Sequence, residues 1–115
     1  MASLYMMTNG VTFSAAALLA ANLQVINRAT LIGEETGGGR NGCIGGVYHD
    51  SPLPGSGLIF RFGLVQFTVL PKVKQIGRGV MPDIPIAYTL DDYLKNKDLE
   101  REWIDNDIKA KGILK

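Results

Sequence analysis

Ser14 is the residue whose position makes the strongest local case for chemistry. It follows a short apolar run at residues 4–8 and a tight Asn9-Gly10 pair, and it directly precedes a stretch of strong helix formers. A hydroxyl at such a junction lies near the unpaired N–H groups and the positive dipole end of a helix, which suit an oxyanion on an attacked carbonyl. Serine is also a usual N-cap residue, so a plain helix cap is the alternative, and on position alone it is the commoner role.

The glycine-rich stretch at residues 33–42 is the second candidate. Three of its glycines match a G-x-G-x-x-G pattern after a strand, but no helix-forming segment follows, as a dinucleotide site requires. We therefore reject a nucleotide site. A glycine-rich loop can approach another backbone closely, which would let Thr36, Gly37 and Gly38 border a peptide-binding cleft. A flexible connection is the alternative.

The other reactive side chains give weaker signals. His49 is the only histidine and stands beside Asp50 in a Pro/Gly-rich stretch, so we interpret it as a surface residue rather than a base. Cys43 is the only cysteine, which excludes an internal disulfide, and we predict no metal centre and no cofactor. Arg78 and Asp83 bracket a tight turn that could hold an ion pair between them.

The elements that must position these residues predict an α/β fold. Strands at residues 4–8 and 29–32 flank a helix at residues 14–27, and such units pair their strands in parallel with a right-handed crossover. The helix is apolar nearly all the way round, so we expect it to be largely buried. Residues 33–57 are predicted to form a loop. Residues 58–69 are predicted to form a β-hairpin with a type II′ turn at Gly63-Leu64.

The C-terminal third predicts an edge strand followed by two capped helices. Pro85 cannot donate to a strand ladder, which places residues 84–87 at the edge of a sheet. Thr89 and Asp92 have the spacing of a capping box. Asp98 can cap the second helix, and Gly112 can end it.

Composition excludes several classes of protein. The chain has 115 residues, is 46% hydrophobic and carries a formal charge of +1, which predicts one core and no nucleic-acid partner. The longest apolar stretch, residues 13–26, is interrupted by Asn22 and Gln24 and is shorter than the roughly 20 residues of a membrane span. We therefore expect no membrane span. No signal peptide is recognisable either.

Four short sequence blocks occur in the same order as in a known protein family. They are Asn9-Gly10-Val11-Thr12-Phe13-Ser14-Ala15-Ala16, residues 28–38 with Gly-Glu-Glu-Thr-Gly-Gly at their end, Leu-Pro-Gly-Ser-Gly at 53–57, and Gly-Arg-Gly-Val-Met-Pro-Asp-Ile at 77–84. Together they resemble the S41 serine peptidases, which include C-terminal processing and tricorn-type proteases. The resemblance implies a crotonase/ClpP-like α/β fold, of which residues 1–115 would be the C-terminal portion of one catalytic domain.

The same resemblance implies roles for particular residues. Ser14 would be the nucleophile of peptide-bond hydrolysis, and the N–H of Ala15 would form half of the oxyanion hole. The loop at Thr36, Gly37 and Gly38 would border the substrate cleft. The implied substrates are peptides or unfolded proteins, and the implied location is the bacterial periplasm or cell envelope.

Departures from the family pattern concern the general base. Processing proteases carry a Lys base where this chain has Gly39, and Arg40 beside it stays protonated at any working pH. This favours the tricorn-like Ser/His type, in which the histidine lies upstream of all these blocks, so we expect the base-bearing segment to be absent from this chain. Gln75 stands near the expected place of the acidic partner and could orient an imidazole.

Two functional hypotheses follow. In the first, the parent protein is an active serine endopeptidase and residues 1–115 alone are inactive, because a serine without a base is a weak nucleophile. In the second, it is a catalytically dead S41-like module that binds peptides or apolar ligands. In either case exposed strand edges and the apolar faces of residues 4–7 would favour self-association of this chain.

Overall fold

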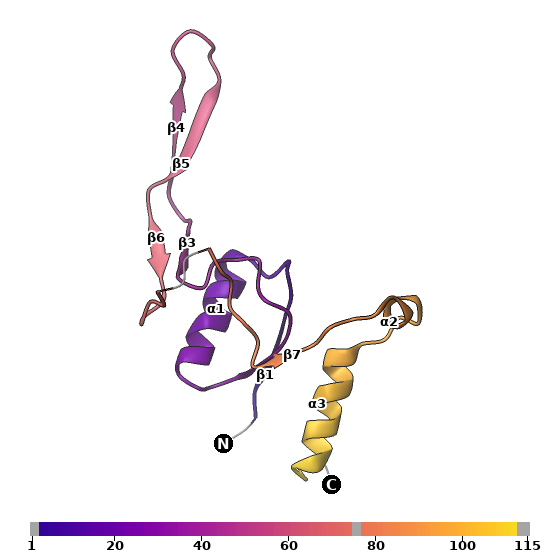
Figure 1. Ribbon diagram of the computed structural model, residues 1–115. Coiled ribbons are helices and arrows are strands. Elements are labelled where there is room, and N and C mark those ends of the chain that lie inside the picture. Colours follow the sequence, from indigo (N-terminus) through magenta and orange to yellow (C-terminus); the bar gives the residue numbers. More distant parts are fainter. Residues whose placement is uncertain (1–2, 75–76, 113–115) are drawn as a thin grey trace.

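The computed structural model describes residues 3–74 and 77–112, and it shows an elongated molecule. Its extents are 67 × 36 × 26 Å and its radius of gyration is 18.6 Å, against about 13 Å for a compact chain of this length. The accessible surface is 8154 Å², whereas a compact protein of this mass exposes roughly 6200 Å². Figure 1 shows why: a small body around α1 carries a projecting β-arm and a separate pair of helices.

The body is built on a parallel strand–helix–strand unit. β1 (Tyr5–Thr8) leads into α1 (Ser14–Val25), which returns to β2 (Thr30–Gly33). β1 pairs in parallel with β2, and β2 pairs in parallel with β7 (Ile84–Pro85), so the sheet order is β1-β2-β7. The predicted unit and the predicted edge strand at Pro85 are both confirmed.

The core lies between one face of α1 and the central strand. Its members are apolar: the small Ala20 and Ala21, the β-branched Val69 and Val80, and Leu31. The expectation of a largely buried helix is wrong, because Leu19 is 54% exposed and Ile26 is 66% exposed. The small sheet covers one face of α1 only, and the alanines on that face allow close approach.

The arm contradicts the predicted loop and hairpin. It contains β3 (Gly42–Ile44), β4 (Tyr48–Pro52), β5 (Ile59–Gly63) and β6 (Gln66–Thr68). β4 pairs antiparallel with β5, and β3 pairs antiparallel with β6, so the polypeptide goes out and back as one long ribbon. The reversal is at the arm's tip, where Leu53 N–H donates to the Leu58 carbonyl at 2.8 Å.

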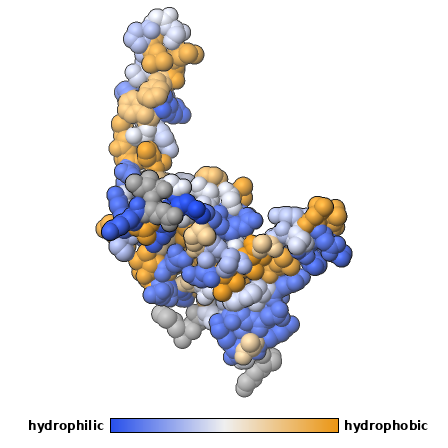
Figure 2. All heavy atoms as spheres, viewed as in Figure 1, coloured by the Kyte–Doolittle hydropathy of each residue, from blue (hydrophilic) through white to orange (hydrophobic). Residues whose placement is uncertain are grey.

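Gly63 therefore lies within the ribbon and not in a turn. It pairs with Tyr48, and a Cβ built on it would lie 2.0 Å from Cγ2 of Ile44. Glycine is required here by close packing, whereas the sequence suggested a turn. The arm is largely exposed, and Figure 2 shows hydrophobic residues along much of its length.

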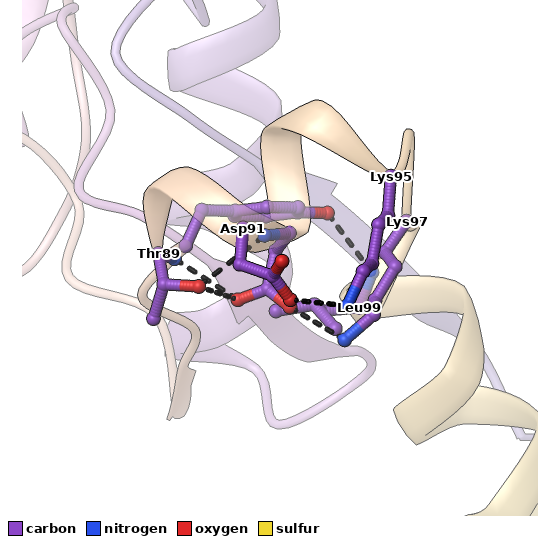
Figure 3. A network of polar contacts seen from close by, with 7 residues as sticks. Thr89, Asp91, Lys95, Lys97 and Leu99 are labelled. Carbon is purple, nitrogen blue, oxygen red and sulfur yellow. Dashed lines mark hydrogen bonds and ion pairs between the residues drawn. The ribbon is translucent and has the colours of Figure 1, made fainter.

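The C-terminal part consists of α2 (Leu90–Leu94) and α3 (Leu99–Ala110), capped as predicted. Thr89 and Asp92 form a complete capping box, and Asp98 accepts from the Arg101 N–H. Lys97 donates to Asp92 at 2.7 Å across the bend between the helices (Figure 3). Hydrogen bonds from Lys97 and from Thr89 lower the pKa of Asp92 from its ordinary 3.8 to about 2.

Helix α3 is tied to β1 through Tyr5. The Tyr5 hydroxyl donates to Asp107 at 2.5 Å, and its ring meets Trp103 edge-on at a centroid distance of 6.5 Å. Trp103 thus anchors the helix against β1. In the part of the chain that the structure describes, no helix combines the length and the apolar character needed to cross a bilayer.

Candidate active site

Ser14 is the first residue of α1 and has an unusual backbone conformation. Its φ is 49°, in the left-handed region that residues other than glycine rarely adopt. This conformation costs about 1–2 kcal/mol, and strained residues of this kind concentrate at functional sites. The N-cap is Phe13, whose side chain makes no capping bond. The helix-cap interpretation of Ser14 is therefore wrong.

The turn before Ser14 is held by local hydrogen bonds. Asn9 Oδ1 accepts the Val11 N–H at 3.1 Å, and the Thr12 N–H donates to the Asn9 carbonyl at 2.9 Å. Asn9 N–H in turn donates to Thr12 Oγ1 at 3.1 Å. These bonds close the connection between β1 and α1, so that Ser14 emerges from it with an exposed side chain.

Backbone donors are available beside Ser14. The N–H of Ala16 donates to the Phe13 carbonyl at 3.1 Å. Within residues 3–74 and 77–112, no acceptor takes the N–H groups of Ser14 or Ala15. Ala15 is also exposed. Free N–H groups next to a nucleophile at a helix N-terminus are the donors that an oxyanion hole uses.

The glycine loop packs directly against this turn. A Cβ on Gly37 would lie 2.2 Å from the Gly10 carbonyl oxygen, and a Cβ on Gly38 would lie 2.6 Å from Cβ of Ala17. Gly38 N–H donates to the Thr12 carbonyl at 2.9 Å. The loop that the sequence suggested as a cleft border is thus brought next to Ser14, and its glycines are needed for this contact.

Behind the loop, buried Thr36 joins it to residues 78–80. The Thr36 hydroxyl donates to the Gly38 carbonyl and accepts the Val80 N–H, both at 2.8 Å. A Cβ on Gly79 would lie 1.8 Å from the Thr36 carbonyl oxygen. Two sequence blocks far apart in the chain therefore meet backbone to backbone and support the Ser14 turn.

The predicted ion pair of Arg78 is with a different partner. Arg78 Nε donates to Glu35 at 2.8 Å, and Glu35 also accepts the Gly79 N–H at 2.7 Å. The hydrogen bond from Arg78 lowers the pKa of Glu35. Asp83 instead accepts the backbone N–H of buried Leu31 at 2.8 Å, so it fastens β2 to the segment before β7. Arg78 and Asp83 flank the same turn, yet their side chains have different partners, so the ion pair predicted between them does not form.

The contact of Cys43 with Ser14 was not predicted from the sequence. The Cys43 Sγ lies 3.9 Å from Ser14 Oγ, and this is the hydrogen-bond contact of the Ser14 hydroxyl among the described residues. β3 packs against α1, which brings the thiol there. Ser14 and Cys43 are far apart in the sequence, and no motif links them. Their contact depends on where the arm leaves the body, which the sequence does not indicate.

The remaining candidates do not meet Ser14. His49 lies on β4 in the arm, where its ring packs on Phe62 at a centroid distance of 5.3 Å. Gly39 bridges to Gly79, and the Arg40 side chain lines a recess together with Gln24 and Met81. Gln75 lies outside the described residues.

A family model matches the part of the chain that contains this arrangement. The family model for Peptidase family S41 matches residues 1–86, which include β1, the Ser14 turn, the glycine loop and the Arg78–Asp83 segment. Comparison with curated proteins gave no significant match. The match extends over well more than half of the 115 residues. The chain belongs to peptidase family S41.

Proposed function

We propose that this chain carries the nucleophile of a serine endopeptidase and that Ser14 is that nucleophile. The observation that carries the proposal is the left-handed φ of 49° at Ser14, an exposed residue whose N–H, like that of Ala15, has no acceptor among the described residues. Membership of family S41 supports a peptidase in general. We further propose that the parallel β1-β2-β7 sheet and α1 are part of a crotonase/ClpP-like domain.

In this mechanism the Ser14 oxygen attacks the carbonyl carbon of a peptide bond while a base takes its proton. The tetrahedral oxyanion accepts the Ala15 N–H, which supplies half of the oxyanion hole. The amine leaves with the proton, and water then hydrolyses the acyl-enzyme on Ser14. Thr36, Gly37 and Gly38 hold the nucleophile turn in place and border the bound peptide.

The base is proposed to be a histidine outside this chain, as in the tricorn-like Ser/His type. Ser14 Oγ contacts Cys43 Sγ, and no lysine or histidine among the described residues bonds to it. Residues 1–115 alone should then be inactive, because an unassisted serine hydroxyl is a weak nucleophile. Gln75 remains a prediction as the residue that orients the base.

A fluorophosphonate probe tests the nucleophile. The longest natural form of the protein should be labelled at Ser14, located by peptide mass spectrometry, and Ser14→Ala should abolish the label. Ser56→Ala, at the tip of the arm, is the matched control and should be labelled like the parent. A folded parent protein that takes no label at Ser14 would show that Ser14 is not an activated nucleophile.

The second candidate is a peptide or apolar-ligand binding module without catalysis. The thiol as the sole described partner of Ser14 Oγ favours it, since a thiol 3.9 Å away is a poor base for a serine. Ser14→Ala separates the two candidates. Unchanged ligand affinity with no hydrolysis by either form supports binding alone, whereas hydrolysis that is lost on substitution supports the peptidase.

A further inference from the structure

A cavity of about 570 Å³ opens at the carboxyl ends of β1 and β2. On one side it is lined by Asn9 and Thr12, which belong to the turn that holds Ser14. On the other side it is lined by residues of the segment before α2, of α2 itself and of the bend that leads into α3, seen in Figure 3. Ligands of parallel α/β sheets bind outside the carboxyl ends of the strands, and this cavity occupies that place.

The fixed charges of the cavity are predominantly negative. Glu34 and Glu100 both line it. Glu100 is half-buried, and a Cβ on Gly33 would lie 3.3 Å from its Oε1, so the carboxylate sits against the end of β2. Its other oxygen accepts the Tyr88 hydroxyl, while Oε1 has no hydrogen-bond partner among the described residues. The Glu34 side chain likewise makes no hydrogen bond to any described residue.

The cation at the wall of the cavity is already neutralised. Lys97 lines the cavity, but its ammonium is bonded to Asp92 at 2.7 Å, and Asp92 is fully ionised at neutral pH because its pKa is about 2. Glu34 and Glu100 are therefore not balanced by a neighbouring charge in the lining. An incoming positive group would be attracted and would find carboxylate oxygens free to accept from it.

Two tyrosines complete the lining. The rings of Tyr88 and Tyr93 lie 5.0 Å apart with their planes inclined at 33°, and both line the cavity. The Tyr88 hydroxyl is fixed by Glu100 and by the Leu99 N–H at 2.9 Å, so this ring is held in place. Tyr93 is 60% exposed. Aromatic faces beside carboxylates form a site for a planar cation, because guanidinium stacks on the ring and donates N–H groups at its edge.

We propose that this cavity binds the guanidinium group of an arginine side chain in a peptide held at Ser14. The inference rests on the proposed peptidase function, because the turn shared by the cavity and Ser14 would then place the arginine at a fixed position relative to the cleaved bond. Lysine binds less well, since its ammonium is a compact, strongly hydrated charge that does not stack. The site makes the chain selective for peptides that carry arginine near the cleavage point.

Binding of short blocked peptides to the 115-residue chain tests the proposal. Acetyl-Ala-Arg-Ala-amide is compared with the same peptide carrying citrulline, which keeps the shape of the side chain and removes its charge. We expect the arginine peptide to bind roughly tenfold more tightly in a calorimetric or NMR titration, from stacking and charge-assisted hydrogen bonds together. Cross-peaks of Tyr93 and of the α2–α3 bend should shift on binding.

Variants locate the effect in the cavity. Glu100→Gln keeps an acceptor for Tyr88 and removes the charge, and Tyr93→Leu keeps an apolar side chain and removes the aromatic face; each should reduce the preference for arginine. Asp105→Asn removes one negative charge from the same helix outside the cavity lining and should leave the preference unchanged. Equal affinity for arginine and citrulline peptides, or an equal loss in Asp105→Asn, would overturn the proposal.

The outcome is separable from that of the proposed function. Ser14→Ala should bind the arginine peptide like the unchanged chain, so a preference for arginine with no fluorophosphonate label would leave the cavity assigned and the nucleophile refuted. A labelled Ser14 without any preference for arginine would support the nucleophile and refute the assignment of the cavity.

Discussion

Replacing Gly38 by alanine should lower the stability of the chain and disturb the Ser14 turn. An added Cβ would lie 2.6 Å from Cβ of Ala17 and 3.1 Å from the Ser14 nitrogen. Neither neighbour can move away freely, because Ala17 is buried in the helix and Ser14 is held at its start. The backbone of Gly38 has no positive φ, so any cost comes from lack of space rather than from conformational strain.

The expected magnitude follows from the contacts that must change. Overpacking of a well-packed site costs about 1–3 kcal/mol, and displacement of the loop would also weaken the 2.9 Å hydrogen bond from Gly38 N–H to Thr12, which is worth about 0.5–1.5 kcal/mol. The free energy of unfolding should therefore fall by about 2–4 kcal/mol. With a urea dependence near 2 kcal/mol/M, the unfolding midpoint moves down by about 1–2 M.

Gly10→Ala is the matched control for this measurement. Gly10 lies in the Ser14 turn, against which the glycine loop packs. Nothing lies within 4 Å of a Cβ added to Gly10, and the φ of Gly10 is not positive. The variant's free energy of unfolding, measured in urea, should stay within about 0.5 kcal/mol of that of the unchanged chain, as for ordinary surface substitutions. Equal midpoints for Gly38→Ala and Gly10→Ala would refute the claim that the glycine loop is pressed against the Ser14 turn.

Further predictions concern contacts away from this loop. Asp83→Ala leaves the buried N–H of Leu31 without its acceptor and should cost about 1–3 kcal/mol, measured by urea unfolding, with unchanged stability as the contrary result. Because the pKa of Asp92 is lowered on folding to about 2, the stability it contributes is present above about pH 4 and is lost as pH falls toward 2. The protection of the α2 amides, taken relative to their intrinsic exchange rate at each pH, should fall over that range, and Asp92→Asn should remove this dependence. We also propose that the chain self-associates through its exposed apolar arm, so Phe60→Ser should shift sedimentation toward monomer, whereas a monomer at all concentrations before substitution would contradict this.

Local chemistry was sufficient to predict the elements that are specified by neighbouring residues. The capping box at Thr89 and Asp92 and the cap at Asp98 need contacts only three residues away, so their residue types identify them. The β1-α1-β2 unit is similarly evident, because the helix formers after Ser14 lie between two apolar runs. In each case the partner atoms lie within one helical turn or in the adjacent element.

The arm could not be predicted in this way because its pairings depend on distant residues. Alternation in residues 58–69 identified strand residues correctly, yet their partners are residues 42–52 and not one another. A glycine beside leucine suggests a turn, but the same glycine is equally suited to a strand position that is crowded by Ile44. Alternation reports the face that a residue occupies and carries no information on the identity of the neighbouring strand.

The backbone conformation of Ser14 likewise could not be predicted from neighbouring residues. Serine before a helix predicts a cap, and the actual cap is Phe13, one residue earlier, so a shift of a single residue turns a capping hydroxyl into an exposed one in the left-handed region. We attribute that shift to tertiary contacts: Gly37 and Gly38 pack against the turn, and Thr36 joins their loop to Val80. If these contacts create the strain, loosening them in Gly38→Ala should also relax φ at Ser14, and fluorophosphonate labelling of the longest natural form should slow even under conditions where the variant remains folded. Labelling at the unchanged rate would mean that the backbone of Ser14 is set by its own turn and not by the glycine loop.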